Sequence, residues 1–475
     1  MSLSSVKSLI ALLATAALLA ACGGSLVGSA PPPVGGLTLE PGEGGVTLSW
    51  TAVPGVVYWA YTGQSATLCK NCNNANDWYG KGVVGARSLG WQTPITSPYF
   101  FTGNAKDGYI ETNLNNDVLY SFIMDGRTNG KPAGDATPSV STTPRLNGAN
   151  WYTGGTLGSG NVTGLAFGPK LNPSNSTYDA TGTYLALGSG GVKYQSANGL
   201  NWTQITTATA TDTKNWKSAT YAFRDNTVIQ KFVGVGAGGA VVYSTDLATF
   251  TSATSGSQDL NAVASNTSMV VAVGNQGTIL RSTDGVNWTA AASVPNTTDL
   301  YAVTYATVAT GGLWVAVGAG GTLWVSADAS TWATVNSGTT QDLKGVASVK
   351  NATYPNGIYS KSVTPADSYS VVAVGNAGVV TQSALGLSGW TPQTLGAGVN
   401  LNAIVASSAL IPTNQFMAVG DGGAAFTSPD GVTWKERTPY PTPTINPKQD
   451  LTGLIRGYNN QYLAWAANGS TTYSK

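Results

Sequence analysis

The chain has 475 residues, and its 23 basic and 22 acidic side chains leave it almost uncharged. This balance excludes the electrostatic attraction that favours nucleic acid or an anionic membrane surface as a partner. The sequence contains no histidine, so Ser/His and Cys/His catalytic pairs are excluded and the commonest metal ligand is missing. We expect no nucleic-acid partner, no cofactor and no metal.

Residues 1–21 have the pattern of a signal peptide. Lys7 supplies a positive charge, and the apolar run that follows it, residues 9–19, is shorter than the ~20 residues of a membrane-spanning helix. We expect this segment to direct export and to be removed.

Ala20 and Ala21 precede Cys22, and this sequence resembles the lipobox of bacterial lipoproteins. The resemblance implies cleavage before Cys22, a diacylglycerol on its thiol and an acyl chain such as palmitate on the new amino terminus. Several acyl chains give durable anchoring. Because Gly23 follows, and not an aspartate, the resemblance also implies an outer-membrane anchor on the periplasmic side or the cell surface. An ordinary secretory signal is the alternative.

Residues 22–36 are rich in Gly, Ser and Pro, which is typical of a flexible tether after the lipidated cysteine. In residues 37–145, short runs of alternating apolar and polar residues predict strands separated by Gly- and Pro-containing turns. This segment resembles a fibronectin type III module, with Trp50 as the core tryptophan and Tyr120 as the tyrosine of the penultimate strand. The resemblance implies a two-sheet sandwich.

Cys69 and Cys72 form a C-x-x-C pair in a stretch rich in Gly and Asn. A thioredoxin-like site needs a strand that leads into a helix, and haem attachment needs a histidine where Asn73 stands. We expect a short disulfide loop in an oxidising compartment. Zinc or copper binding and free thiols are the alternatives.

From Asn161 onward the sequence repeats with a period of about 40 to 50 residues. Each unit has an Asp or Asn, a run with a central Ala or Gly, an apolar run that ends in Gly, a tight turn, and a final run with an aromatic. The opening residues are Asn161, Asn215, Asp259, Asp299, Asp342, Asn400 and Asp450. The closing aromatics are Trp202, Phe250, Trp288, Trp332, Trp390 and Trp434.

Four strand-length runs in each unit predict an all-β fold, a seven-bladed β-propeller over residues 146–475. The seventh unit lacks its last strand and its closing aromatic. Residues 147–155 contain both, so we expect them to complete that blade and to make Trp151 the seventh closing aromatic. The split unit favours a closed ring over an open solenoid.

The turn between the third and fourth runs has the pattern S-x-D-x-x-x-W. It resembles the Asp-box of BNR-like repeats in sialidase-like, sortilin-like and photosystem II assembly-factor-like propellers. A serine and an aspartate at this spacing cap the amides of a tight turn while the aromatic packs beneath it, so we expect a structural role. The aspartates concerned are Asp246, Asp284, Asp328 and Asp430.

The resemblance to sialidases implies three arginines around a carboxylate, a Tyr/Glu nucleophile pair and an aspartate acid. The repeat region has a single glutamate, Glu436, and four arginines: Arg224, Arg281, Arg437 and Arg456. Glu436, Arg281 and Arg437 fall on outer strands. These residues do not form the expected constellation, so we predict no catalytic residues.

The seven opening residues are expected to converge on one face near the channel mouth. Four carboxylates and three amides there would suit a cation or a basic or hydroxyl-rich ligand. The alternative, which we favour, is that each side chain caps its own turn. Trp216 and Tyr301 lie beside these residues, where they either pack between blades or stack on a sugar. Two long insertions, residues 168–182 and 349–369, join first to second strands and are expected on the opposite face.

These features favour a non-enzymatic, lipid-anchored envelope protein, a monomer that offers its propeller as a binding or scaffold surface for a protein or a glycan. A glycan-active enzyme of the envelope, sialidase-like or polysaccharide-degrading, and a surface adhesin are the alternatives. The sequence does not indicate the ligand or which propeller face binds it.

Overall fold

The computed structural model describes most of the chain from Val34 onward. The described ranges are 34–42, 45–51, 57–63, 107–111, 119–127, 137–143, 151–158, 161–174, 177–178, 182–206, 213–223, 230–308, 311–353, 366–384, 386–406, 416–437, 449–457 and 461–474. The signal-like segment, Cys22, Cys69 and Cys72 lie outside them, so the predictions made for these residues stay predictions. Within the described ranges, no helix has the length and apolarity to cross a membrane.

The chain divides into two compact units, the first ending at Pro144 and the second beginning at Arg145. The described strands of the first unit form two three-stranded sheets. One contains β1 (Val34–Gly42), β2 (Gly45–Thr51) and β4 (Asp107–Glu111), and the other β3 (Val57–Gly63), β5 (Tyr120–Arg127) and β6 (Val140–Thr142).

Strands of both sheets of the first unit are buried. Val46, Leu48 and Trp50 follow one another at every second position of β2, and all three are buried. Because successive side chains of a strand point to opposite faces, this pattern places one face of that sheet in a core. In β5 the four consecutive residues 120–123 are buried, so both faces of this strand are covered.

Apart from one small two-stranded sheet, the described strands of the second unit form seven four-stranded sheets, each running from an inner to an outer strand. Blade one contains β8 (Val162–Gly168), β11 (Thr183–Gly188), β12 (Lys193–Ser196) and β13 (Thr203–Gln204). Blade two contains β14 (Trp216–Phe223), β15 (Gln230–Gly236), β16 (Ala240–Ser244) and β17 (Thr251–Thr254). Blade three contains β18 (Leu260–Ser265), β19 (Val270–Gly274), β20 (Ile279–Ser282) and β21 (Thr289–Ala290).

Blade four contains β22 (Leu300–Val308), β23 (Gly311–Gly318), β24 (Leu323–Ser326) and β25 (Ala333–Thr334). Blade five contains β26 (Leu343–Thr353), β27 (Ala366–Gly375), β28 (Val379–Ser383) and β29 (Thr391–Thr394). Blade six contains β30 (Leu401–Ala406), β31 (Phe416–Gly420), β32 (Ala425–Ser428) and β33 (Lys435–Arg437). The strands of each blade are antiparallel and follow one another in sequence. The innermost strands touch in a ring, and the contact of the seventh with β8 closes it.

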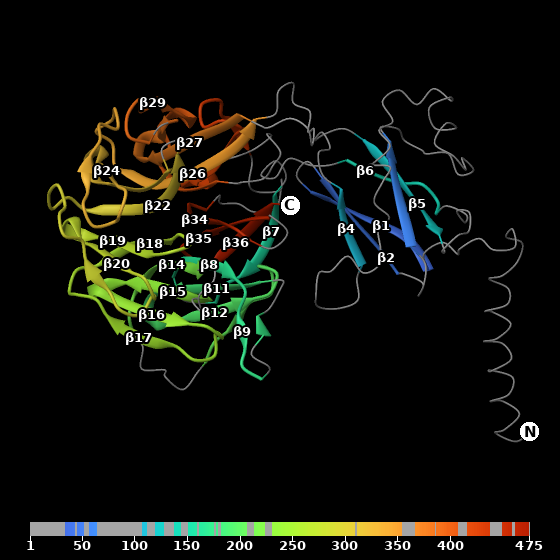
Figure 1. Ribbon diagram of the computed structural model, residues 1–475, viewed down its shortest axis with the longest axis horizontal. Coiled ribbons are helices and arrows are strands. Elements are labelled where there is room, and N and C mark those ends of the chain that lie inside the picture. The colour runs from blue at the N-terminus through green and yellow to red at the C-terminus, as the bar shows by residue number, and fades with distance from the viewer. Residues whose placement is uncertain are drawn as a thin grey trace, which may run out of the picture. The chain divides into compact units, whose positions relative to one another are not determined.

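Blade seven is built from both ends of the unit. It contains β34 (Leu451–Arg456), β35 (Tyr462–Ala466), β36 (Ser470–Ser474) and, as its outer strand, β7 (Trp151–Thr156). Trp151 is opposite Ser474 and Tyr152 is opposite Tyr473, and Figure 1 shows β7 beside β36. The predicted seven-bladed propeller is confirmed. Its closing strand is observed at 151–156, and residues 147–150 lie outside the described ranges.

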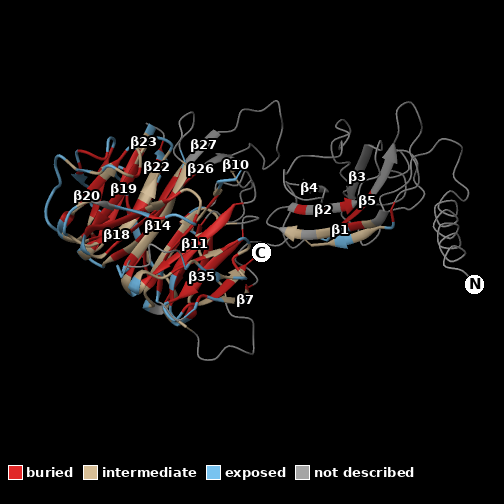
Figure 2. Ribbon diagram, turned by 90° about the horizontal axis from the view of Figure 1, so that it is seen from below, coloured by how far each residue is buried: buried red, intermediate tan, exposed pale blue. Residues whose placement is uncertain are grey.

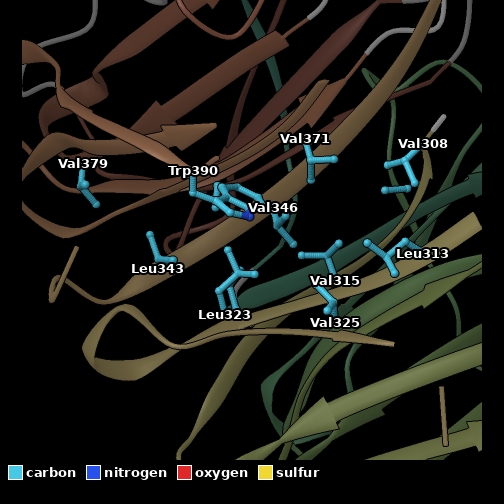
Figure 3. Packing of buried hydrophobic residues seen from close by; sticks show 13 residues of the cluster. Val308, Leu313, Val315, Leu323, Val325, Leu343, Val346, Val371, Val379 and Trp390 are labelled. Atoms are coloured by element: carbon cyan, nitrogen blue, oxygen red, sulfur yellow. The ribbon is translucent and has the colours of Figure 1, made fainter. Parts of the chain in front are cut away.

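Seven apolar clusters fill the seven interfaces between neighbouring blades. Figure 3 shows the cluster between blades four and five, in which Trp390 of blade five packs together with residues of blade four such as Val315 and Leu323. Trp151 takes the corresponding place between blades six and seven and is 4% exposed. Each closing aromatic therefore covers the preceding blade.

The second strand of a blade is buried on both faces because each sheet is packed between two others. All five residues of β19 and of β31 are buried, and Figure 2 shows buried positions along the strands and exposed ones in the turns. This explains why these strands read as continuous apolar runs and not as alternating ones.

The two faces of the ring carry different connections. The opening face carries the opening residues and the 3-10 turns between second and third strands. These turns are η1 (Ser189–Gly191), η2 (Ala237–Gly239), η3 (Asn275–Gly277), η4 (Ala319–Gly321), η6 (Asn376–Gly378) and η8 (Asp421–Gly423). The insertion face carries the turns between third and fourth strands and the connections between first and second strands. A further 3-10 turn, η7 (Gly396–Gly398), follows β29.

The two insertions contain more strand than the sequence predicts. The first forms a small hairpin from β9 (Leu171–Asn172) and β10 (Thr177–Tyr178). In the second, residues 349–353 extend β26 and pair with residues 366–370 of β27. The described parts of this insertion continue the sheet because their backbone groups pair across it.

Candidate functional site

The side chains of six opening residues bind a backbone amide in the turn of the preceding blade, where we expected each to cap its own turn. Two of them also reach the turn of their own blade, Asn400 through Asp421 at 2.8 Å and Asp342 through Asn376 at 3.4 Å. Asp259 Oδ1 of blade three accepts a hydrogen bond from the Gly238 amide of blade two at 2.7 Å. The other pairs are Asn215 with Gly190, Asp299 with Gln276, Asp342 with Gly320, Asn400 with Ala377 and Asp450 with Gly422, at 2.7 to 3.0 Å. Each side chain is therefore a clamp between neighbouring blades.

The backbone carbonyl of an opening residue serves its own blade. The Asp259 carbonyl accepts a hydrogen bond from the Asn275 amide of the same blade at 2.9 Å. The next amide along the chain, that of Gln276, is the one that the Asp299 side chain binds. The amide that is clamped belongs to a residue with positive φ, such as Gly238 at 63°. Glycine adopts this conformation without steric cost, which explains its frequency at this position.

Blade seven departs from this pattern. Its turn is capped from within, because Asn468 Oδ1 accepts a hydrogen bond from the Ser470 amide at 3.0 Å. Asn161, which opens blade one, uses its backbone carbonyl for the Ser189 amide at 2.9 Å. At the seam between blades seven and one, the turn of blade seven is therefore held by its own Asn468.

A β-bulge follows each opening residue, two positions along the chain. The register shifts so that one residue near the start of every inner strand is left without a partner. Bulges re-aim a side chain and are common beside functional sites. We call these residues the bulge ring: Thr163, Lys217, Asn261, Tyr301, Lys344, Asn402 and Thr452.

Three members of the bulge ring join neighbouring inner strands. Asn261 Nδ2 donates to the Leu300 carbonyl at 2.9 Å, and Asn402 Nδ2 donates to the Leu451 carbonyl at 3.0 Å. The Thr163 hydroxyl donates to the carbonyl that begins the next blade in the same way. These contacts hold the ring together at its axis.

The charged and aromatic members of the bulge ring are Lys217 on blade two, Tyr301 on blade four and Lys344 on blade five. Lys217 Nζ is 2.9 Å from Asp259 Oδ2 and also 2.9 Å from Asn261 Oδ1. Lys344 Nζ lies 3.8 Å from the centre of the Tyr301 ring, a cation–π contact, and 3.2 Å from Asp342 Oδ2. We call the run Lys217, Asn261, Tyr301 and Lys344 the mouth arc.

The carboxylates beside the mouth arc are held in the ionised form. The Gly238 amide and then Lys217 keep the pKa of Asp259 below its usual value. The Gly320 amide and Lys344 do the same for the pKa of Asp342, against an opposing effect of burial. Burial, together with the carboxylates of Asp342 and Asp299, raises the pKa of Tyr301.

Trp216 does not lie open at the mouth. It is 1% exposed and packs with Phe232 and Leu187 between blades one and two, so it is a core residue and cannot stack on a sugar. Tyr301 is half-buried and belongs to the mouth arc. Sequence reasoning missed the bulge ring as a whole. The sequence does carry a pattern that could have revealed this ring. In all seven units, a position whose residue type varies comes directly after a Leu, Val or Trp that is buried.

The serine–aspartate turns lie on the insertion face and cap themselves. Asp284 Oδ1 accepts from the Val286 and Asn287 amides at 2.8 and 2.7 Å, and Ser282 Oγ accepts from the Gly285 amide at 2.8 Å. Asp246, Asp328 and Asp430 make the same contacts in their own blades. These side chains are engaged in local backbone contacts.

Two turns vary the pattern. Blade one has Asn198 in place of the aspartate, and its Oδ1 accepts from the Leu200 and Asn201 amides at 2.9 and 3.0 Å. Blade five has lost the aspartate, but Ser383 Oγ still accepts from the Gly386 amide at 3.0 Å. The turn of blade five is therefore held by the serine together with the closing tryptophan, since Trp390 Nε1 donates to the Gly386 carbonyl at 3.1 Å.

The residues considered for glycosidase chemistry are not brought together by the structure. Glu436 is exposed on β33, and its neighbour Arg437 donates to Thr427 Oγ1 at 2.9 Å on the same outer region. Arg281 is on β20 of blade three and Arg456 on β34 of blade seven; Arg224 lies outside the described residues. The described part of the chain also has no group of three or more Cys, Asp or Glu residues placed to hold a metal ion.

The strand order and the seven interfaces define the class of protein as a seven-bladed β-propeller with a strand-exchanged last blade. No protein-family model and no curated protein matches the sequence. Among solved structures the chain is similar to YCF48 bound to D1 peptide, with 14% identity over 69% of this chain and 95% of that chain, at a TM-score of 0.47.

Two further solved structures show the same level of similarity. YCF48 from Cyanidioschyzon merolae is 11% identical over 69% of this chain and 98% of that chain, at a TM-score of 0.46. The WD40 β-propeller domain of Doa1 is 9% identical over 69% of this chain and 97% of that chain, at a TM-score of 0.48. Likeness at this level assigns no ligand to this chain.

Proposed function

We propose that the chain is an exported, lipid-anchored envelope protein without enzymatic activity, and that the mouth of its propeller binds a protein partner. The observation that carries this proposal is the bulge ring. Seven equivalent bulges present a side chain at the same place in every blade, while the type of that side chain changes from blade to blade. A rigid frame with one variable position in each repeat suits specific recognition.

The mouth arc has the chemistry of a protein-binding surface. Two ammonium groups, an amide and a tyrosine ring lie on four consecutive blades, with carboxylates beside them. Tyrosine combined with charged hydrogen-bonding groups is typical of protein–protein contacts. The mixed charge suits a peptide that itself carries both signs.

The state of the carboxylates supports a binding role over catalysis. A general acid or base works best with a pKa near the operating pH. Asp259 and Asp342 have lowered pKa values, and each also has one oxygen occupied by a backbone amide. Both groups are therefore suited to remain ionised and fixed.

The anchoring and the stalk belong to the same proposal. The lipobox-like sequence before Cys22 supports attachment to the envelope, and residues 22–36 supply a tether. The two three-stranded sheets, with buried Trp50 and Tyr120, support a fibronectin type III-like module within residues 37–145. The self-capped serine–aspartate turns support membership of the Asp-box propellers. This arrangement would join the propeller to the lipid through a tether and a folded module.

A variant that removes the mouth arc tests the proposal. It combines Lys217→Gln, Tyr301→Ala and Lys344→Gln, and it is compared with the wild type by chemical cross-linking in intact cells followed by mass spectrometry. The matched control is Lys231→Gln, Tyr243→Ala and Lys435→Gln. Its Lys231 and Tyr243 form another cation–π pair at 4.9 Å, in blade two.

We expect the wild type and the control to capture the same envelope protein and the mouth variant to lose it at least tenfold, with all three melting as folded propellers. Equal capture by the mouth variant would contradict the proposal. Release of sugar from an envelope polysaccharide by the wild type would instead support the glycan-active alternative.

A further inference from the structure

A pocket of about 380 Å³ lies in blade one, on the insertion face and therefore on the opposite side of the ring from the mouth. This volume is at the lower end of the range for small-molecule sites, which is roughly 300 to 1,000 Å³. Seven of the eight lining residues are of polar type, among them Lys170, Thr183, Gln195, Asn198, Asn201 and Thr203, while carbon atoms supply the larger part of the lining surface.

The small hairpin of the first insertion positions the lysine of the pocket. The Leu171 amide donates to the Thr245 carbonyl of blade two at 2.7 Å, which fastens the start of the hairpin across the blade boundary. Lys170, the preceding residue, directs its Nζ to Gln195 Oε1 at 3.3 Å. An ammonium group has three donors, so this contact leaves capacity for a ligand.

The departure of blade one from the turn pattern removes a negative charge from this pocket. Blades two, three, four and six have an aspartate in the serine–aspartate turn, and blade one has Asn198. Asn198 makes the same capping contacts, so the turn does not require the change. Its consequence is that Lys170 is the single charged residue among those that line the pocket.

We propose that this pocket binds a small carboxylate that carries hydroxyl groups, of the uronic acid class. Lys170 pairs with the carboxylate, since an ammonium–carboxylate contact is among the strong hydrogen bonds of proteins. The Gln195 and Asn201 amides and the Thr203 hydroxyl both donate and accept, as sugar hydroxyls do. This function is separate from the binding of a protein at the mouth.

Titration of the full-length chain in detergent micelles with D-glucuronate tests the proposal, with D-glucose and acetate as comparison ligands. We expect D-glucuronate to bind at millimolar concentration or below and to bind at least tenfold more tightly than either comparison ligand. Lys170→Gln removes the charge and is expected to weaken glucuronate binding about tenfold, the worth of one charge-assisted hydrogen bond.

Asn198→Asp is the sharper variant. The turn accepts an aspartate in four other blades, so folding should be retained, while the new carboxylate competes for Lys170 and repels the ligand. We expect it to weaken glucuronate binding at least as much as Lys170→Gln. Lys435→Gln, at an exposed lysine on β33, is the matched control and should bind normally, as should the mouth variant.

Two results would overturn the proposal. One is the absence of glucuronate binding to the wild type at millimolar concentration. The other is an equal affinity in the wild type, Lys170→Gln and Asn198→Asp. Because the mouth variant is expected to retain glucuronate binding, failure here is distinguishable from failure of the protein-binding function.

Discussion

Asp284 shows how one side chain can stabilise a turn in a way that depends on pH. Burial opposes its ionisation, but the amides of Asn287 and Val286 and the Ser282 hydroxyl outweigh this effect and lower its pKa to about 2. An aspartate in the unfolded chain has a pKa of roughly 3.9. The stabilisation from Asp284 is therefore fully present above about pH 4 and is lost as the pH falls through about 2.

Asp284→Asn should remove this pH dependence without removing the turn, since Asn198 occupies the same position in blade one. At pH 7 we expect the variant to be less stable by about 1 kcal/mol, because a hydrogen bond to a charged acceptor is stronger than one to a neutral amide. Between pH 4 and pH 2 the difference should shrink. Urea denaturation midpoints across this range measure it.

The control for this comparison is Glu436→Gln, which removes an exposed carboxylate that is not in a turn. It should follow the wild type at every pH. A constant difference between the wild type and Asp284→Asn down to pH 2 would contradict the assigned role.

Residue roles were predictable where the partner is local. The spacing of Ser282 and Asp284 indicated a capped turn because both contacts lie within three residues. The target of Asp259 was not predictable, since Gly238 lies 21 residues earlier and becomes a neighbour only when the blades stack. The bulge ring was missed for a similar reason, because a bulge is defined by the register of two strands.

Among the elements, β7 decides whether the ring is closed. It supplies the fourth strand of blade seven, covers the edge of β36 and places Trp151 in the core between blades six and seven. Removing residues 146–155 should expose that edge and leave an apolar gap at one interface. We expect loss of the cooperative thermal transition of the propeller and association of the protein, measured by circular dichroism and size-exclusion chromatography.

Deletion of residues 36–140 is the control, and it should leave the transition of the propeller unchanged. A point substitution gives a finer test. A Cβ on Gly155 would lie 1.9 Å from the Leu200 carbonyl oxygen of blade one, so Gly155→Ala must displace backbone and should cost roughly 1 to 3 kcal/mol. Normal melting of the 146–155 deletion would show that closure does not depend on β7.

The elements of the repeats were largely predictable, because each carries a landmark. An apolar run that ends in glycine marks the second strand, and an aromatic marks the start of the fourth. Insertions carry no such landmark, which is why the extension of β26 and β27 was missed. Hydrogen bonds between their backbones, and not an apolar pattern, decide that those residues are strands.

At the scale of the whole molecule, the repeat count and the split last unit were sufficient to predict the propeller and its closure. The first unit was harder to predict, since its strands have no internal repeat to compare. The ligand was not predictable at all, because a propeller holds its binding groups on positions that vary while the frame stays the same.

Anchoring is a prediction about the whole molecule. Cys22→Ser removes the thiol that would accept lipid, so we expect the variant to incorporate no palmitate and to leave the membrane fraction. Metabolic labelling with palmitate and cell fractionation measure this. Cys69→Ser with Cys72→Ser is the control and should label normally; persistent labelling of Cys22→Ser would contradict the lipobox assignment.

The exchanged strand also has a consequence for the order of folding. Thr472 donates to the Tyr152 carbonyl, and the two residues are 320 positions apart in the chain. The first strand of the propeller to be synthesised, β7, therefore cannot pair until the last one, β36, has been made. Contacts of such long range form slowly because the loop must be closed before they contribute. A chain interrupted before Ser470 has six potential blades and no ring, with Trp151 unpaired at one end. The ring therefore cannot close before residues 470–474 have been synthesised, and a truncated copy exposes an apolar end that proteases and chaperones can recognise.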